Sequence, residues 1–249
     1  KYAWNILKST ILSRIQHKAQ LFYTKKFDYE KDNSFYTDKT SFNSSHKFAI
    51  DRVNKNSIVF DIGSGPGVVA GELFKKLCIT YGVDRHIQDS LIASCKSTQR
   101  VDLDFIDKNT FEFKESKLDA ILLLDIIEHI KDADNFLLVL RNRFSSYNPK
   151  VIITTANIAF FIMRISLLFG IFQYGKKGIL DKTHTRLYTF SSLKRLLSDS
   201  GYEIEEVRGI PIPFPLVFGD NMFSHFLLLI NNFFIRISKG FFSYQIAIT

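Results

Sequence analysis

The segment Asp61-Ile-Gly-Ser-Gly-Pro-Gly67 constrains the fold more than any other feature of this chain. It follows the short apolar run Ser57–Asp61 and precedes Val68–Leu77, where apolar residues recur at helical spacing. Glycines let a backbone turn sharply and approach a ligand where a Cβ would clash. The amides at a helix N-terminus also favour an anionic group. A strand, a glycine turn and a helix in this order predict a ligand-binding α/β fold.

Strand and helix patterns alternate beyond this turn. We expect strands at 57–61, 79–84, 101–106, 118–124, 151–155, 202–207 and 242–248, and helices at 68–77, 88–97, 132–144 and 191–200. No repeat or low-complexity linker interrupts the chain, which predicts a single domain over residues 1–249. Within it we expect an N-terminal helical and lid segment at 1–56, a cofactor-binding core at 57–156, and an acceptor-side cap with closing strands at 157–249.

Asp84 ends the second predicted strand, roughly 20 residues after the glycines, where an acid suits the two hydroxyls of an adenosine ribose. A dinucleotide site stays open on the glycines alone, because Gly65-Pro-Gly-Val-Val-Ala70 fits the looser G-x-G-x-x-A pattern. Asp61 favours a different ligand, because an acid before the turn can bind the ammonium of an amino-acid group. The isolated closing strand also departs from the dinucleotide pattern.

Three segments resemble class I S-adenosylmethionine (SAM)-dependent methyltransferases: Val59–Gly67, Tyr81–Asp84 and Leu118–His129. The resemblance covers residues 55–155, with a looser match to the end. It implies a Rossmann-like three-layer α/β/α sandwich with a mostly parallel seven-stranded sheet. The last strand of that sheet is antiparallel and inserted between the fifth and sixth, and a helical, aromatic cap covers the strand ends.

The resemblance also implies which residues bind SAM. Asp61 and the turn would hold the methionine moiety, Asp84 the ribose, and Asp102 the adenine amine, with Asp104 as a rival for that last role. The full set of cofactor-binding residues implied is Asp61, Gly63, Ser64, Gly65, Gly67, Asp84, Arg85, Asp102, Leu103 and Asp125.

Two histidines are candidate catalytic bases for an oxygen acceptor, since imidazole titrates near neutrality. His129 follows the fourth predicted strand and His184 the fifth, at the ligand end of the sheet. Asp125-x-x-Glu128-His129 also resembles the E-x-x-E-H motif of ubiquinone-type O-methyltransferases and small-RNA 2′-O-methyltransferases. Some of these hold a divalent cation there, so Asp125, Glu128, His129 and His184 are weak metal candidates. The shorter Asp125 disfavours metal dependence.

The segment Gly178–Leu197, closed by Ser200-Gly-Tyr202, is similar to bacterial methyltransferases of glycan and glycolipid assembly. This similarity implies a small or lipid-linked acceptor, which we expect to be methylated at oxygen. Lys182 and Arg186 would bind a phosphate or carboxylate of that acceptor, or serve as ordinary surface charges. Competing functions are a catalytically silent methyltransferase-like binding module and an NAD-dependent reductase.

Two aromatic stretches, Phe160–Tyr174 and Phe223–Phe242, hold much of the chain's 25 Phe. The second predicts an amphipathic helix, which either packs on the core or a homodimer partner, or makes a peripheral membrane contact through 222–242. A net charge of +8 favours phosphate-bearing partners, but no basic stripe indicates nucleic acid. No apolar run reaches the ~20 residues of a membrane span. We therefore expect a cytoplasmic protein, free or peripheral to the inner face of the membrane.

Overall fold

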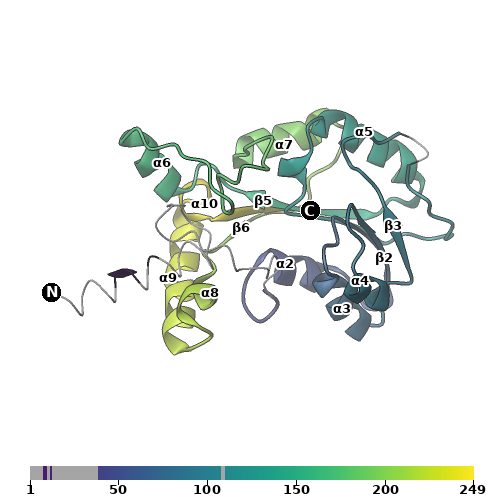
Figure 1. The fold of residues 1–249 in the computed structure, drawn as a ribbon, viewed down its shortest axis with the longest axis horizontal. Coiled ribbons are helices and arrows are strands. Elements are labelled where there is room, and N and C mark those ends of the chain that lie inside the picture. The colour runs from purple at the N-terminus through teal and green to yellow at the C-terminus, as the bar shows by residue number, and fades with distance from the viewer. Residues whose placement is uncertain (1–7, 10–11, 13–38, 108–109) are drawn as a thin grey trace.

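The fold is built around a β-sheet. The computed structural model describes residues 8–9, 12, 39–107 and 110–249. In this part of the chain seven strands form one sheet in the order β3-β2-β1-β4-β5-β7-β6 (Figure 1). Their bounds are β1 Ile58–Ile62, β2 Ile79–Asp84, β3 Ser97–Arg100, β4 Ala120–Leu124, β5 Lys150–Ala156, β6 Val207–Ile210 and β7 Gln245–Ile248. Only β7 pairs antiparallel with its neighbours β5 and β6 among these strands. The predicted sheet, with its inserted last strand, is confirmed.

Helices cover both faces of the sheet (Figure 1). On one face lie α2 (Ser45–Arg52), α3 (Val68–Lys75) and α4 (Asp89–Ser94), and on the other α5 (Ala133–Phe144) and α7 (Phe190–Asp199). Short 3-10 helices η3 (Ile127–His129) and η4 (Ser145–Tyr147) flank α5 in the sequence. At the end of the molecule away from β3 lie α6 (Phe161–Leu168), α8 (Phe214–Phe218), α9 (Met222–Ile237) and α10 (Lys239–Phe242).

Apolar side chains on the two faces of the sheet form two separate cores. Successive strand residues point to opposite faces, so Val59 packs with α2 and α3 while Phe60 packs with α5. Phe60 is fully buried. Its ring packs edge-to-face on Phe111, with the ring centroids 5.6 Å apart, and its centroid lies 5.1 Å from that of Phe144. Strands buried on both faces explain why β1 and β4 read as continuous apolar runs in the sequence.

Two of the predicted strands are wrong. The third strand is Ser97–Arg100, not 101–106, because this edge strand is polar and lacks the apolar pattern. Residues after it form a loop in which Asp102 Oδ1 accepts from the amide of Asp104 at 3.2 Å. The sixth strand is Val207–Ile210, so the predicted strand 202–207 meets it only at Val207. The amide of Glu205 instead donates to the Thr249 carbonyl at 2.9 Å.

Capping residues mark both ends of α7. Thr189 caps α7 by accepting from the amide of Ser192, and Gly201 follows the helix at a φ of +80°. The predicted amphipathic helix corresponds to α9, which ends at Ile237, and α10 follows after Ser238. Of the predicted N-terminal helical and lid segment at 1–56, residues 1–7, 10–11 and 13–38 lie outside the described residues.

Candidate functional site

A cleft of about 440 Å³ opens at the carboxyl ends of the central strands. It brings together residues that the sequence places in separate segments. The predicted site residues that line it are Asp61, Gly63, Ser64, Asp84, Asp125, Glu128, His129 and His184. A smaller pocket of about 130 Å³ shares Gly63, Asp84 and His129 with the cleft and adds Arg85, Asp102, Leu103 and Asp104.

The glycine turn is held rigidly against β2. The amides of Gly63 and Ser64 donate to the Val83 carbonyl at 2.7 and 3.1 Å. The Ser64 hydroxyl donates to the Asp61 carbonyl at 2.6 Å and accepts from the Val83 amide at 3.0 Å. A Cβ on Gly63 would lie 2.8 Å from Ile126 Cδ1, and its φ is +78°, so this position requires glycine.

Two acids flank this turn in different surroundings. Asp84 accepts from the amides of Gly65 at 2.8 Å and His86 at 2.9 Å. Asp61 is buried, and burial together with the negative charge of Asp84 raises its pKa to about 7. A cationic group bound beside Asp61 would favour the ionised carboxylate. The turn is therefore suited to a ligand that carries both an ammonium and sugar hydroxyls.

The smaller pocket combines apolar walls with a charged rim. Leu103, Ile126 and Ile130 contribute apolar surface. On the rim, Asp102 forms an ion pair with Arg85, which lowers the pKa of the Asp102 carboxyl. Asp104, the rival for adenine contact, pairs with Lys131 at 3.0 Å. Both acids therefore lie beside a space with the mixed polarity that a purine requires.

Asp125 joins four elements of the fold at the floor of the cleft. It follows β4 with a φ of +54°, an uncommon conformation for a residue with a side chain. Its Oδ1 accepts from the Thr154 hydroxyl at 2.9 Å and from the side-chain amide of Gln245 at 2.8 Å. The Ser45 hydroxyl donates to Oδ2 at 3.3 Å. Strands β5 and β7 and helix α2 thus fix the direction of this carboxylate.

The imidazole rings of His129 and His184 contact each other edge to face in the lining of the cleft. Their ring centroids lie 4.8 Å apart at an interplanar angle of 74°. Nδ1 of His129 lies 3.3 Å from the Thr183 carbonyl, and Nδ1 of His184 lies 3.0 Å from the Ile179 carbonyl. A carbonyl oxygen only accepts, so Nδ1 of each ring donates, and Nε2 is the nitrogen of each ring that is left for a ligand. Burial, opposed by the Ile179 carbonyl and assisted by His129, lowers the pKa of His184.

Glu128 lies deep in the wall of the cleft. Its Oε1 accepts from the Ala156 amide at 3.4 Å, and its own carbonyl accepts from the Thr185 amide at 2.8 Å. Burial, and to a smaller extent Asp125, raises the pKa of the Glu128 carboxyl well above its ordinary value. Among the residues that the structure describes, no group of three His, Cys, Asp or Glu side chains forms a metal-holding arrangement.

Sequence reasoning missed several residues that line the cleft: Lys39, His46, Lys176, Lys177, Tyr244 and Gln245. Tyr244 and Gln245 lie at the start of β7, where alternation indicated a strand but not which residues reach the site. Lys182 and Arg186, expected either to bind an anion of the acceptor or to be surface charges, are not among the lining residues, and Arg186 pairs with Asp134 at 2.6 Å. The lysines at the cleft come from other segments.

Comparison with known proteins agrees with this geometry. Residues 30–207 match the family described as "Methyltransferase domain". The ubiquinone biosynthesis O-methyltransferase of Rickettsia canadensis is 25% identical over 158 residues, covering 61% of this chain and 65% of that protein. The enzyme of the same name from Rickettsia typhi is 25% identical over 160 residues, covering 61% and 62%. The chain thus spans less than two thirds of the length of these relatives.

One solved structure supports the fold alone. The small RNA methyltransferase HEN1 superposes with a TM-score of 0.53 at 18% identity, over 89% of this chain and 26% of that one. A likeness at this identity concerns the arrangement of strands and helices and carries no information about substrate.

Proposed function

Because this chain belongs to the class I SAM-dependent methyltransferase family, we propose that it methylates an oxygen atom of a small or lipid-linked acceptor. The observation that carries this proposal is the pair of imidazole rings of His129 and His184, whose centroids lie 4.8 Å apart in the same cleft as Asp125. Oxygen acceptors gain most from a base that titrates near neutrality. The two ubiquinone-type relatives support an oxygen acceptor, since their names state O-methylation.

The cofactor half of the cleft has the groups that SAM requires. We assign the ammonium of SAM to Asp61, the ribose hydroxyls to Asp84, and the adenine to the pocket around Leu103. The glycine turn fits because a Cβ at Gly63 would close the space against Ile126. When bound, SAM would supply a methyl group on a sulfonium, and the neutral thioether would be the leaving group as the sulfur–methyl bond breaks.

The acceptor half then has to orient a hydroxyl and take up one proton. We assign the base to His184, whose Nδ1 is held by the Ile179 carbonyl so that Nε2 is available to the acceptor. His184 accepts the hydroxyl proton at Nε2 as the new carbon–oxygen bond forms. His129 is the second candidate base, and its ring limits the positions that the acceptor can take.

The charges in the cleft support an acceptor with a negative group. Asp61 and Asp84 lie at the cofactor half. The remainder of the lining contains the lysines Lys39, Lys176 and Lys177 together with the acids Asp125, Glu128 and Asp181. A cationic donor beside acids and an anionic acceptor beside lysines would be drawn together, and the lysines would favour the ionised form of the acceptor oxygen. A phosphate or carboxylate near the methylated hydroxyl is consistent with the likeness to glycolipid-assembly enzymes.

Calorimetric titration with SAM tests the cofactor half. We expect micromolar binding by the wild-type chain and its loss in Asp61→Ala and Asp84→Ala. Asp199→Asn is the matched control, because Asp199 is an exposed acid on α7 far from the cleft. Thermal unfolding with SAM or with NAD separates the methyltransferase from a reductase, since the true ligand raises the midpoint. A folded chain that binds no SAM would overturn the proposal.

The acceptor half is tested by a transfer assay with candidate acceptors of defined chemistry. Hydroxylated aromatic acids, sugar phosphates and their lipid-linked forms should gain one methyl group by mass spectrometry. Methyl esters of the same acids, which lack the negative charge, should react more slowly if the lysines act as proposed. Products methylated on nitrogen or carbon would contradict O-methylation.

A further inference from the structure

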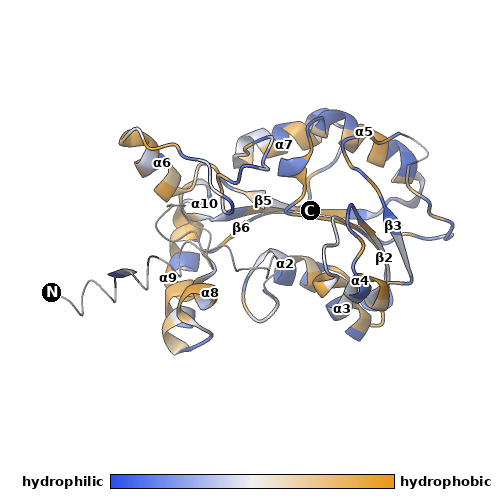
Figure 2. Cartoon of the chain, in the orientation of Figure 1, coloured by the Kyte–Doolittle hydropathy of each residue, from blue (hydrophilic) through white to orange (hydrophobic). Residues whose placement is uncertain are grey.

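Helix α9 carries an apolar stripe on its outward side. Met222, Phe226, Leu229, Phe233 and Ile237 follow one another at three- and four-residue spacing, so they share one face of the helix. Their side chains are 57–90% exposed. Figure 2 shows this hydrophobic helix at the end of the molecule away from β3. Exposed apolar residues that form one patch, unlike scattered ones, mark an interaction surface.

The inward side of α9 is partly polar, which reverses the usual arrangement of a surface helix. Ser224 and Asn231 are buried beside Leu228. Asn231 accepts from the Ile212 amide at 2.9 Å and donates to the Phe242 carbonyl at 3.1 Å. These bonds fix the helix to the body of the protein through polar groups. The apolar stripe therefore lies away from the face by which α9 is anchored to the body of the protein.

A second apolar surface lies at the same end of the molecule, on α6 and the residues after it (Figure 1). Its exposed members are Ile165, Leu167, Leu168, Phe169, Ile171 and Phe172. Ring contacts through α10 connect it to α9, because Phe242 lies 6.0 Å from Phe161 and 5.0 Å from Phe234. We call the α9 stripe and these α6 residues together the apolar end.

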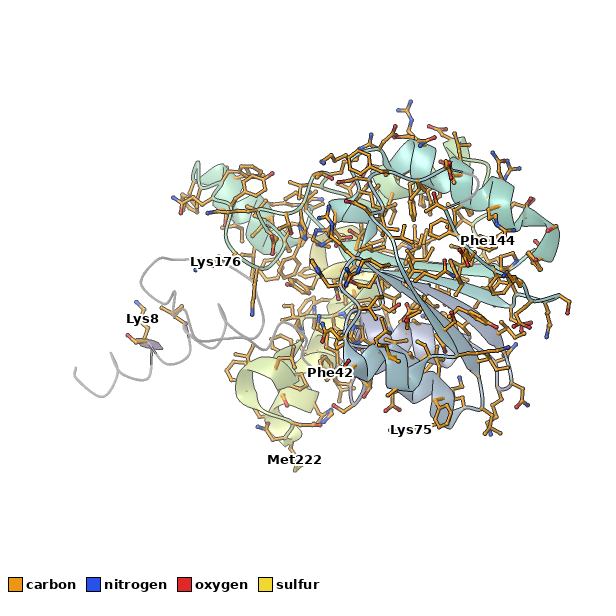
Figure 3. All side chains as sticks on the ribbon, turned by 45° about the vertical axis from the view of Figure 1, so that its right-hand side comes forward. Lys8, Phe42, Lys75, Phe144, Lys176 and Met222 are labelled. Carbon is orange, nitrogen blue, oxygen red and sulfur yellow. The ribbon has the colours of Figure 1, made fainter. Side chains whose placement is uncertain are left out.

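The charges of the apolar end are mostly positive, although Asp220, just before α9, pairs with His225 at 2.6 Å. Residues 157–180 contain Arg164, Lys176 and Lys177 and no acid, and residues 221–242 contain Arg236 and Lys239 and no acid. Apart from Lys177, which is half-buried, these cations are exposed. Figure 3 shows Lys176 and Met222 projecting at the side of the molecule that carries α6 and α9.

We propose that the apolar end docks on a bilayer that contains anionic phospholipids. Amphipathic helices with aromatic and aliphatic residues on one face and cations beside them bind such interfaces without crossing them. None of the helices in the described part of the chain is long and apolar enough to span a membrane. An anionic surface also complements the excess of positive charge at the apolar end.

A second copy of the chain fits this surface less well. A two-fold dimer places the same patch of both subunits in contact, so the cations of one copy would meet those of the other. Buried or close like charges oppose association, whereas lipid phosphates would neutralise them. The charge pattern therefore favours the bilayer over a homodimer through this surface.

Docking in this way would present the cleft to a lipid-linked acceptor, an extension that rests on the proposed function. Lys176 and Lys177 follow the α6 surface in the chain and also line the cleft. An anionic headgroup could reach these lysines while its tail stayed in the bilayer. The apolar end and the acceptor half of the cleft are thus joined by one short segment.

Sedimentation of the full chain with vesicles tests the docking. We expect binding to vesicles of phosphatidylcholine with phosphatidylglycerol, and little binding to phosphatidylcholine alone or at high salt. Leu229→Glu/Phe233→Glu and Leu168→Glu/Phe169→Glu should each weaken partitioning roughly tenfold or more. Phe74→Glu is the matched control, because Phe74 is an exposed Phe on α3. No binding to anionic vesicles, or equal binding by all variants, would overturn the proposal.

Two further measurements on the same proteins separate the other outcomes. If light scattering shows a dimer that Leu229→Glu/Phe233→Glu disrupts, and vesicles do not bind, the apolar end is a homodimer interface and the proposal is wrong. Circular dichroism confirms that each variant folds. SAM calorimetry on the same variants should be unchanged, so loss of docking with intact SAM binding is distinct from failure of the proposed function.

Discussion

The side-chain amide of Gln245 donates a 2.8 Å hydrogen bond to Oδ1 of Asp125, across a separation of 120 residues in the chain. The Thr154 hydroxyl donates to the same oxygen at 2.9 Å. These two bonds hold the carboxylate of a residue in the left-handed region, which a side chain adopts only at some cost in energy. The inserted strand β7 therefore helps to shape the cleft directly.

Gln245→Leu should lower kcat about tenfold with a small change in stability, because Asp125 loses one of the donors that set its direction. Gln245→Glu should be worse, since it places a second negative charge beside Asp125. Steady-state kinetics and thermal unfolding of the same preparations separate the two effects. Gln88→Leu, at an exposed position before α4, serves as the control. Wild-type kcat in Gln245→Leu would show that the bond has no role in positioning.

Asp61 should make the stability of the free protein depend on pH. Its pKa is raised from 3.8 to about 7, so the folded state favours the protonated form. The stabilisation of the folded state by protonated Asp61 is fully present below the unfolded pKa. It is lost as pH rises through about 7, and the free energy of unfolding then falls by at most about 1.4 kcal/mol per pH unit. Urea unfolding across this range should give a shallower pH dependence in Asp61→Asn than in the wild type. Parallel curves for the two proteins would refute the prediction.

SAM affinity should show the opposite pH dependence at the same residue. The ionised carboxylate binds an ammonium, so affinity should rise as pH increases through about 7 and be insensitive to this titration in Asp61→Asn. Calorimetry at matched ionic strength measures the effect directly. Wild-type affinity that does not change across this range would contradict the assignment of Asp61.

His184→Gln should lower kcat about a hundredfold and leave SAM affinity unchanged, because the residue acts on the acceptor alone. The pKa of His184 is lowered from 6.5, so the acid limb of the wild-type kcat profile should lie below that value. His129 contributes to the lowering, and His129→Asn should therefore move the limb to higher pH. A limb that persists in His184→Gln would assign the base to another group.

Gly63→Ala should both destabilise the protein and abolish SAM binding. The added methyl group meets Ile126 at 2.8 Å and the backbone has a φ of +78°. Gly170→Ala provides the matched control, because its φ is +68° but no atom lies within 4 Å of the added Cβ. We expect about 1 kcal/mol of destabilisation at Gly170 and a clearly larger loss at Gly63 by chemical denaturation. Equal losses would show that the close approach to Ile126 is unimportant.

The central part of the fold could be predicted because its residues carry local signals. The turn after Asp61 and the apolar run of β4 each specify structure within a few residues. The polar strand β3 carries no such signal, because it lies at the edge of the sheet and pairs with another of the described strands on one side only. The loop residues Val101 and Leu103 imitate strand alternation instead, which placed the predicted strand too late.

The acceptor side could be predicted only in part, because its contacts join distant segments. His129 and His184 were identifiable from their place after strands, but their ring contact depends on how the 181–186 loop packs on η3. Gln245 was recognisable as part of a strand, yet its bond to Asp125 depends on the register of β7 beside β5, where Gln245 lies opposite Ala156. Periodicity predicted the helix α9 but not that its apolar side would face outward.

The insertion of β7 between β5 and β6 also bears on how the protein folds. Strands β1, β2 and β4 pair within residues 58–124, whereas β7 needs both flanking strands in place before its backbone groups are satisfied. We therefore expect the cofactor half to acquire structure first and β7 to dock late. In native-state hydrogen exchange, amides of β7 should open at a lower free energy than those of β1. The protein could then lose its acceptor site by local opening while its nucleotide pocket stayed folded.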